Sequence, residues 1–133
     1  MKRMNKVHSF LSVFVLILLS AAMAFSMISC GNENDLGKGD KSFTLEVYSA
    51  SGETEIFTVH TNREKVGEAL VDEGLILGEE GPYGLMVHEV NGERHVYEEE
   101  GKYWAFYIDG EYAMTGVDST KITEGAVYAF KVE

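Results

Sequence analysis

Apolar and polar residues alternate along two neighbouring stretches of the chain. In Ser42–Tyr48 the apolar residues Phe43, Leu45 and Val47 are separated by more polar ones, and Thr54–His60 shows the same alternation. A period of two is typical of a β-strand with one buried face. Because residues 49–53 between them are of turn-forming types, the two stretches are predicted to form a β-hairpin.

One amphipathic helix is predicted after this hairpin. Val66, Ala69 and Leu70 recur at spacings of three and four, which is typical of a helix with one apolar stripe. The sequence Thr61-Asn-Arg-Glu64 matches a capping box, and Gly74 supplies a C-terminal stop. The helix is expected to cover about three turns and to pack its stripe on a sheet. Residues 78–82, rich in Gly and Glu and ending in Pro, are expected to form a loop.

The rest of the chain is predicted to be mostly strand. Asn91-Gly92 and Asp109-Gly110 are strong signals for tight hairpin turns. Residues 103–108 are apolar on both alternating faces, as expected of a central strand. The sequence therefore predicts an α+β fold, in which one helix packs on a mixed, mostly antiparallel sheet in a β-grasp-like arrangement.

The N-terminal segment has the layout of an export signal. Lys2, Arg3 and Lys6 precede the apolar run of residues 10–25. A retained transmembrane anchor is the alternative, because the run is nearly long enough to span a bilayer. The sequence Ser26-Met-Ile-Ser-Cys30-Gly31 resembles the bacterial lipoprotein signal, in which the cysteine is lipidated and becomes the mature N-terminus. We therefore expect a signal peptide at 1–29, a lipid on Cys30, and a domain tethered to the extracellular face of the cell membrane.

Composition narrows the possible functions of the exported part. Residues 30–40 are small and polar and predict a flexible tether, which leaves residues 41–133 for one folded domain. Residues 30–133 carry 8 basic and 22 acidic side chains, a net charge of −14. This charge argues against a nucleic-acid partner. The single cysteine excludes a disulfide framework and a zinc site made of several cysteines.

Residues 57–132 as a block resemble the transcobalamin-like C-terminal domain, which occurs in bacterial surface lipoproteins and as the small domain of the animal cobalamin carriers. The resemblance is carried by Val66-Gly-Glu-Ala-Leu70, Tyr83-Gly-Leu-Met-Val-His-Glu-Val-Asn-Gly92, Tyr103-Trp-Ala-Phe-Tyr-Ile-Asp-Gly-Glu-Tyr-Ala-Met-Thr-Gly-Val-Asp118 and Ile122-Thr-Glu-Gly-Ala-Val-Tyr-Ala-Phe130. It implies cobalamin or a related corrinoid as the ligand. The carriers hold their ligand between two domains, so a lone module is expected to offer half a site or to need an envelope partner such as a transporter.

An aromatic strand provides the first group of candidate binding residues. Tyr103 and Tyr107 share one face of the predicted strand, Trp104 shares the other with Phe106, and Tyr112 follows the Asp109-Gly110 turn. One interpretation is ordinary packing on both faces. The other is a ligand-binding platform of Tyr103, Trp104, Tyr107 and Tyr112, because rings with a polar tip suit a flat, partly apolar ligand.

Two histidines provide a second, alternative site. With Asn91-Gly92 as a two-residue turn, His88 lies opposite His95, and Cβ atoms of such partners are about 4.5–5.5 Å apart. The two imidazoles are then placed to share a divalent transition metal, although a third ligand is needed for a firm site. A half-exposed polar pair without a metal is the competing interpretation.

Nothing in the sequence predicts catalysis, because nucleophile-elbow, phosphate-loop and zinc-protease motifs are not found. Three hypotheses follow: a non-enzymatic module that binds a small molecule, a metal-binding lipoprotein, and a protein-interaction module of the cell envelope.

Overall fold

The computed structural model describes residues 34–133, so the predicted signal peptide and the lipidated Cys30 lie outside the described residues. The elements are β1 (Asn34–Gly37), β2 (Lys41–Tyr48), β3 (Thr54–Thr61), α2 (Val66–Asp72), β4 (Ile76–Gly81), β5 (Gly84–Val90), β6 (Glu93–Arg94), α3 (Tyr97–Glu100), β7 (Trp104–Ile108), β8 (Glu111–Tyr112) and β9 (Val127–Val132). In this part of the chain, no helix has the length and apolar character needed to cross a membrane.

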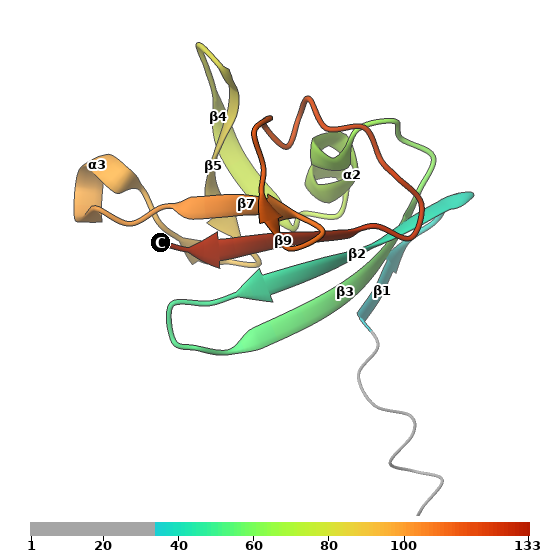
Figure 1. Cartoon of the computed structure of the whole chain (residues 1–133), viewed down its shortest axis with the longest axis horizontal. Coiled ribbons are helices and arrows are strands. Elements are labelled where there is room, and N and C mark those ends of the chain that lie inside the picture. Colours follow the sequence, from blue (N-terminus) through green and yellow to red (C-terminus); the bar gives the residue numbers. More distant parts are fainter. Residues whose placement is uncertain (1–33) are drawn as a thin grey trace, which may run out of the picture. The chain divides into compact units, whose positions relative to one another are not determined.

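Six strands form one sheet, in the order β1-β3-β2-β9-β7-β8 (Figure 1). The pairs β1–β3 and β2–β9 are parallel, and the other neighbours are antiparallel. Strands β4, β5 and β6 form a second, three-stranded sheet. Helix α2 and the β4–β5 hairpin lie on the same side of the large sheet in Figure 1. The predicted α+β class, with a mixed sheet and one packed helix, is confirmed.

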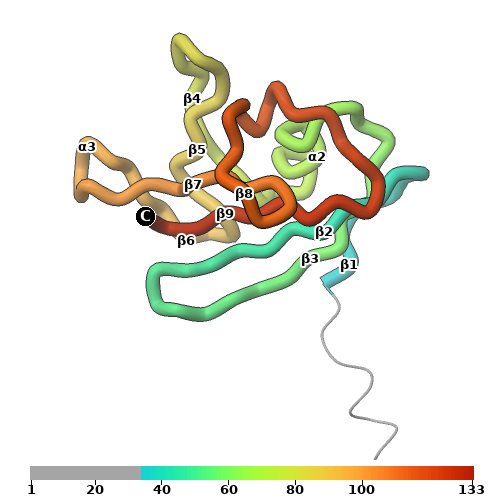
Figure 2. The backbone as a smooth tube through the Cα atoms, in the orientation of Figure 1, coloured from blue at the N-terminus to red at the C-terminus, as the bar shows by residue number. Residues whose placement is uncertain are grey.

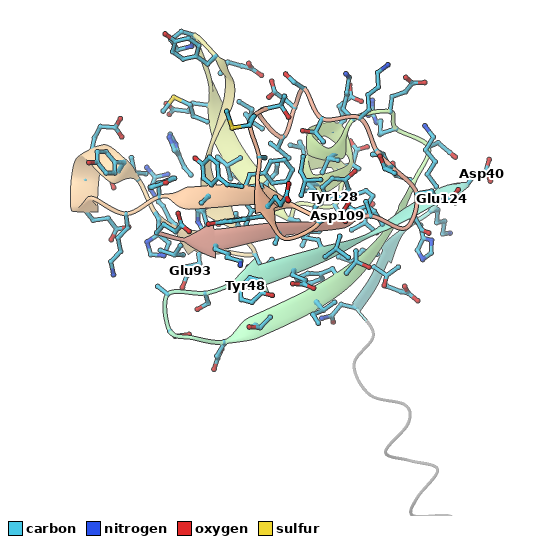
Figure 3. All side chains as sticks on the ribbon, in the orientation of Figure 1. Asp40, Tyr48, Glu93, Asp109, Glu124 and Tyr128 are labelled. Atoms are coloured by element: carbon cyan, nitrogen blue, oxygen red, sulfur yellow. The ribbon has the colours of Figure 1, made fainter. Side chains whose placement is uncertain are left out.

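The core lies between the large sheet and α2, and the predicted alternation places its residues. Phe43, Leu45 and Val47 are buried on the inner face of β2, next to Tyr128 and Phe130 of β9. Figure 3 shows Tyr128 on the side of α2, whereas Tyr48 lies on the opposite face. The same pattern along β7 puts its tryptophan on the inner face and its tyrosine on the outer face.

Strand β1 corrects the predicted tether. Asn34–Gly37 pairs with β3 in parallel register, and Leu36 packs against the core. One partly buried apolar side chain and a row of backbone hydrogen bonds to an otherwise free sheet edge hold this segment in place. The folded domain therefore begins at β1 rather than at residue 41.

The start of α2 corrects the predicted capping box. Thr61 ends β3, and its hydroxyl accepts a hydrogen bond from the backbone of Arg63. The helix begins at Val66 without a side-chain cap, because the N–H groups of Val66 and Gly67 donate to carbonyls of residues 120 and 117 in a distant loop. Its end agrees with the prediction, since Gly74 adopts a φ of 67° and closes a Schellman motif.

The second sheet and the segment after it differ from the prediction in two places. Residues 78–81, expected in a loop, continue β4 and pair with β5, so that the hairpin extends away from the large sheet (Figure 2). After the Asn91-Gly92 turn, pairing stops at Arg94, and Tyr97–Glu100 forms the short helix α3 in a region that was predicted to be mostly strand. Three successive glutamates after Tyr97 favour helix over strand.

Candidate functional site

A groove of about 390 Å³ lies between the β4–β5 hairpin, α3, β7 and the loop after β8. We call it the aromatic groove, because most of its large lining residues are aromatic or methionine. These residues are Tyr83, Met86, His88, Tyr97, Tyr103, Trp104, Phe106, Tyr112 and Met114. Its volume lies within the range of about 300–1,000 Å³ that small-molecule sites occupy.

The rim of the aromatic groove is unusually apolar for a surface. Tyr83 at the hairpin tip is 98% exposed and Met114 across the groove is 94% exposed, while Met86, Tyr97 and Tyr112 are also exposed. These five residues are most of the large apolar side chains that the described part of the chain exposes. Apolar side chains gathered around one hollow mark a surface for binding rather than for folding. Methionine in particular adapts its shape to a bound partner.

Three of the four predicted ligand-binding residues line the aromatic groove, and the fourth does not. Tyr103, Trp104 and Tyr112 line the aromatic groove, whereas Tyr107 does not. Trp104 is 5% exposed and donates its indole N–H to the carbonyl of Glu93 at 3.0 Å. It therefore forms the floor of the groove as part of the core, while Tyr103 and Tyr112 stand at its wall.

Tyr107 belongs to a second aromatic arrangement on the outer face of the large sheet. Its ring meets Tyr112 edge-on at 5.6 Å, and its hydroxyl donates to the carboxylate of Glu133. The ammonium of Lys131 lies 4.6 Å from the Tyr107 ring centre and 4.8 Å from that of Tyr48. Tyr107, Tyr112, Tyr48 and Lys131, which we call the outer row, thus link three neighbouring strands and β8.

Hydrogen bonds with neighbouring side chains raise the pKa of three tyrosines, Tyr48, Tyr103 and Tyr107. The hydrogen bond to Glu133 raises the pKa of Tyr107 to about 12, with smaller effects of desolvation and of the Glu133 charge. The hydrogen bond to Glu46 likewise raises the pKa of Tyr48, and hydrogen bonding with Tyr112 is the largest cause of the raised pKa of Tyr103. These phenols remain neutral hydrogen-bond donors at physiological pH.

The two predicted metal ligands both line the aromatic groove. The backbone N–H of His95 donates to the carbonyl of His88 at 2.8 Å, as the predicted hairpin register requires. The His95 ring is buried, with Nδ1 2.5 Å from Glu100 and Nε2 3.2 Å from Glu93, and it meets Trp104 edge-on. The Nε2 contact is not an aligned hydrogen bond. Within residues 34–133, no three His, Cys, Asp or Glu side chains converge on one metal position.

Asp118 joins the two long walls of the aromatic groove. Its Oδ2 accepts the backbone N–H of Leu85 in the hairpin at 3.1 Å, although Asp118 itself belongs to the opposite loop. A Cβ atom at Gly84 would lie 2.8 Å from both carboxylate oxygens, and one at Gly116 would lie 2.9 Å from Oδ1. The two glycines therefore make room for the carboxylate, and the carboxylate sets how the hairpin stands against the loop.

Sequence reasoning missed two of the rim residues of the groove. Tyr83 lies at a hairpin tip and Met114 in a loop, and no shared periodicity connects them. Strand alternation had placed Met86 and Tyr97 on the face of His88 and His95, as neighbours of a metal site and not as the rim of a groove. Large apolar residues beside glycines in turns, as in Pro82-Tyr83-Gly84 and Met114-Thr-Gly116, were the available signal. Large apolar residues lower the solubility of a protein when they are exposed. Their presence in exposed turns therefore indicates a role other than core packing.

Comparison with known families adds to this geometry. Residues 64–133 match the model of the domain of unknown function DUF4430. The chain belongs to the DUF4430 family. The match runs from the residues before α2 to the C-terminus, so the DUF4430 region includes every wall of the aromatic groove. No curated protein sequence matches the chain.

Several solved structures resemble this DUF4430 protein, including the following two. One is a protein from Ruminococcus gnavus ATCC 29149, described as a "putative metal binding protein", with a TM-score of 0.67 and 26% identity over 71% of this chain and 97% of that chain. The other is haptocorrin in complex with Cbi, with a TM-score of 0.56 and 18% identity over 74% of this chain. This DUF4430 protein spans 26% of the haptocorrin chain, and the likeness shows a shared fold.

Proposed function

We propose that the protein is a lipid-anchored, non-catalytic binding module at the extracellular face of the cell membrane, and that its aromatic groove captures a flat, partly apolar small molecule of the corrinoid class. In this proposal residues 1–29 are the signal peptide and Cys30 carries the lipid. The DUF4430 domain then corresponds to the transcobalamin-like small domain and passes its ligand to an envelope partner.

The aromatic groove is the observation that carries this proposal. Its floor is formed by Trp104 in the core, and its rim carries exposed tyrosine and methionine side chains. A corrinoid offers a broad, flat ring system with polar substituents at its edge, which matches an apolar floor bordered by phenol hydroxyls.

The motifs from Tyr83 to Gly92 and from Tyr103 to Asp118 add support. They resemble the small domain of the cobalamin carriers and supply the hairpin, β7 and the loop that surround the groove. The structural likeness to haptocorrin contributes the fold alone.

Calorimetric titration of the full chain in detergent with cyanocobalamin and cobinamide tests the proposal. Heat that saturates at a stoichiometry of one ligand supports it. No heat up to high micromolar concentrations of both corrinoids contradicts it.

Two tyrosine variants test the position of the site. Tyr112→Ala removes a ring from the groove wall and is expected to weaken corrinoid binding about tenfold, equivalent to about 1.4 kcal/mol. Tyr107→Ala removes a ring of similar size that lies outside the groove and is expected to leave binding within about twofold. The reverse order would contradict binding in the aromatic groove and would move the corrinoid site to the outer face of the sheet.

Metal binding is the second candidate function, favoured by the Ruminococcus gnavus neighbour. His88 and His95 line one groove, but both ring nitrogens of His95 already face carboxylates. A metal on His95 would therefore take Glu93 or Glu100 as a second ligand or would have to displace it. Titration with zinc or copper(II) chloride tests this candidate, and affinity that His88→Ala and His95→Ala leave unchanged would end it.

A further inference from the structure

A second groove, of about 410 Å³, lies between α2 and β4. We call it the acidic groove, after Glu68, Asp72, Glu80 and Asp118 in its lining. Apart from Leu85, at the root of the hairpin, no residue lines both this groove and the aromatic groove. It is therefore a separate site from the one assigned to the corrinoid.

The floor of the acidic groove is aliphatic. Val71 and Leu77 are about half exposed, at 48% and 55%, and they face the groove together with Ile76 and Leu85. The helix presents Val71 on the side away from its buried stripe of Val66, Ala69 and Leu70. Exposure of two branched aliphatic side chains on either side of one hollow leaves apolar area that a ligand can cover.

The charge of the groove is unbalanced. Arg63, its single lining cation, is held by Asp72 through two hydrogen bonds of 2.8 and 3.2 Å, which raise the pKa of this arginine. Among the described residues, no lysine or arginine forms an ion pair with Glu68, Glu80 or Asp118. Asp118 accepts only the Leu85 N–H, and its buried Oδ1 has no donor. Glu68 also acts on Arg63 through its charge, as a smaller cause of the raised pKa of this arginine. Four carboxylates against one arginine still leave the groove with a net negative charge.

We propose that the acidic groove binds an organic amine, with the ammonium group between Glu68 and Glu80 and the aliphatic chain on Val71 and Leu77. The volume lies in the range of small-molecule sites. An ammonium group supplies the charge that the carboxylates lack, and a short alkyl chain covers the exposed aliphatic floor. Neither feature alone would select this ligand class, but the carboxylates and the aliphatic side chains line the same groove.

The test uses n-butylammonium chloride as the probe, with the ¹⁵N-labelled full chain in nanodiscs of phosphatidylcholine. Saturable shifts of the backbone amide signals of Gly67, Leu77 and Gly78 are expected. Binding of n-butanol, which has the chain without the charge, is expected to be at least about fivefold weaker. Equal binding of the alcohol, or shifts confined to other residues, would overturn the proposal.

Two pairs of substitutions separate the groove from the general acidity of the protein. Glu68→Gln with Glu80→Gln is expected to weaken butylammonium binding about fivefold. Glu111→Gln with Glu124→Gln removes the same charge at exposed positions elsewhere and is expected to change binding less than about twofold. An equal loss in both pairs means attraction to net charge only and overturns the proposal.

Leu77→Ala provides an independent check, because it shortens the floor and keeps every charge. It is expected to weaken binding about threefold. Calcium chloride is the last arm of the test: calcium that displaces butylammonium at lower concentration would show a metal site instead of an amine site.

Discussion

The two faces of the large sheet are built on different principles, and adjacent residues of β9 show the contrast. Phe130 points to the inner face, is 1% exposed, and packs on Phe106 with a ring separation of 5.1 Å. Lys131 points to the outer face and lies between the rings of Tyr48 and Tyr107. The inner face is held by close packing under a helix, a hairpin and a loop. Within residues 34–133, the outer face is covered by its own long side chains, such as Lys131 over the rings of Tyr48 and Tyr107.

The outer cover is nevertheless effective. Ala105 and Ala129 belong to the outer face by alternation, yet they are 1% and 6% exposed. They lie in register with Lys131 and Tyr107, so the lysine stem and the phenol ring shield them. One layer of long side chains thus shields the alanines of the outer face from solvent, and no second layer of secondary structure within residues 34–133 packs on it.

The two faces are expected to differ most in the stability that is lost when a large side chain is truncated to alanine. Phe130→Ala leaves a void in the core and is expected to lower the free energy of unfolding by about 3–5 kcal/mol. Ile56→Ala on the outer face of β3, where the side chain is 54% exposed, is expected to cost less than about 1 kcal/mol. Urea unfolding of both variants measures the difference, and similar losses would remove the contrast between the faces.

The next largest effect is expected where Asp118 joins the β4–β5 hairpin to the loop after β8. Gly84 and Gly92 both have positive φ angles, of 108° and 82°. A Cβ at Gly84 meets the Asp118 carboxylate, whereas nothing lies within 4 Å of one at Gly92. Gly84→Ala is therefore expected to cost about 1–3 kcal/mol more than backbone strain alone. Gly92→Ala supplies the strain-only reference in the same thermal or urea unfolding experiment, and an equal cost would show that Asp118 does not hold the hairpin.

Much of the inner face was predictable, because strand alternation and the helix stripe are local. Phe43, Leu45 and Val47 are buried as the period of two requires, and Gly74 ends the helix in the expected conformation. The helix start was not predictable in the same way. Carbonyls of residues 117 and 120 take the place of the capping box, and a partner about fifty residues away leaves no periodic signal in sequence.

The candidate site was predictable only in part for the same reason. The turn at Asn91-Gly92 set the register of His88 and His95, and alternation correctly separated Trp104 from Tyr103 and Tyr107. The groove itself depends on how the hairpin stands against β7 and the loop after β8, and the hydrogen bond from Leu85 to Asp118 joins residues 33 positions apart in the sequence. Pairing of Asn34–Gly37 with β3 was also missed, since one leucine among polar residues carries too little pattern to predict a strand.

A smaller effect is expected from the charge in the outer row. Lys131→Met keeps a stem of similar length over Ala105 but removes the ammonium from the two tyrosine rings. Exposed cation–π contacts contribute about 0.5–1 kcal/mol, so stability is expected to fall by about that amount. Lys102→Met, at an exposed position before β7, is the matched control and is expected to be neutral within about 0.5 kcal/mol. If Lys131→Met loses no more stability than Lys102→Met, the ammonium of Lys131 does not contribute, and only its aliphatic stem stabilises the outer face.

The smallest expected effect is a change in pH dependence at the edge of the outer row. Glu133 raises the pKa of Tyr107 to about 12 in the folded protein, against about 10 for an unfolded chain. The folded state therefore keeps a proton that the unfolded state loses, so the contribution of Tyr107 is complete below about pH 10 and is lost as the pH rises to about 12. Tyr107→Phe cannot ionise and is expected to lose stability less steeply than the natural protein over this interval. Urea unfolding at several pH values measures both slopes, with Tyr83→Phe at the hairpin tip as the control. Equal slopes for the natural protein and Tyr107→Phe would mean that the contact with Glu133 does not persist in solution.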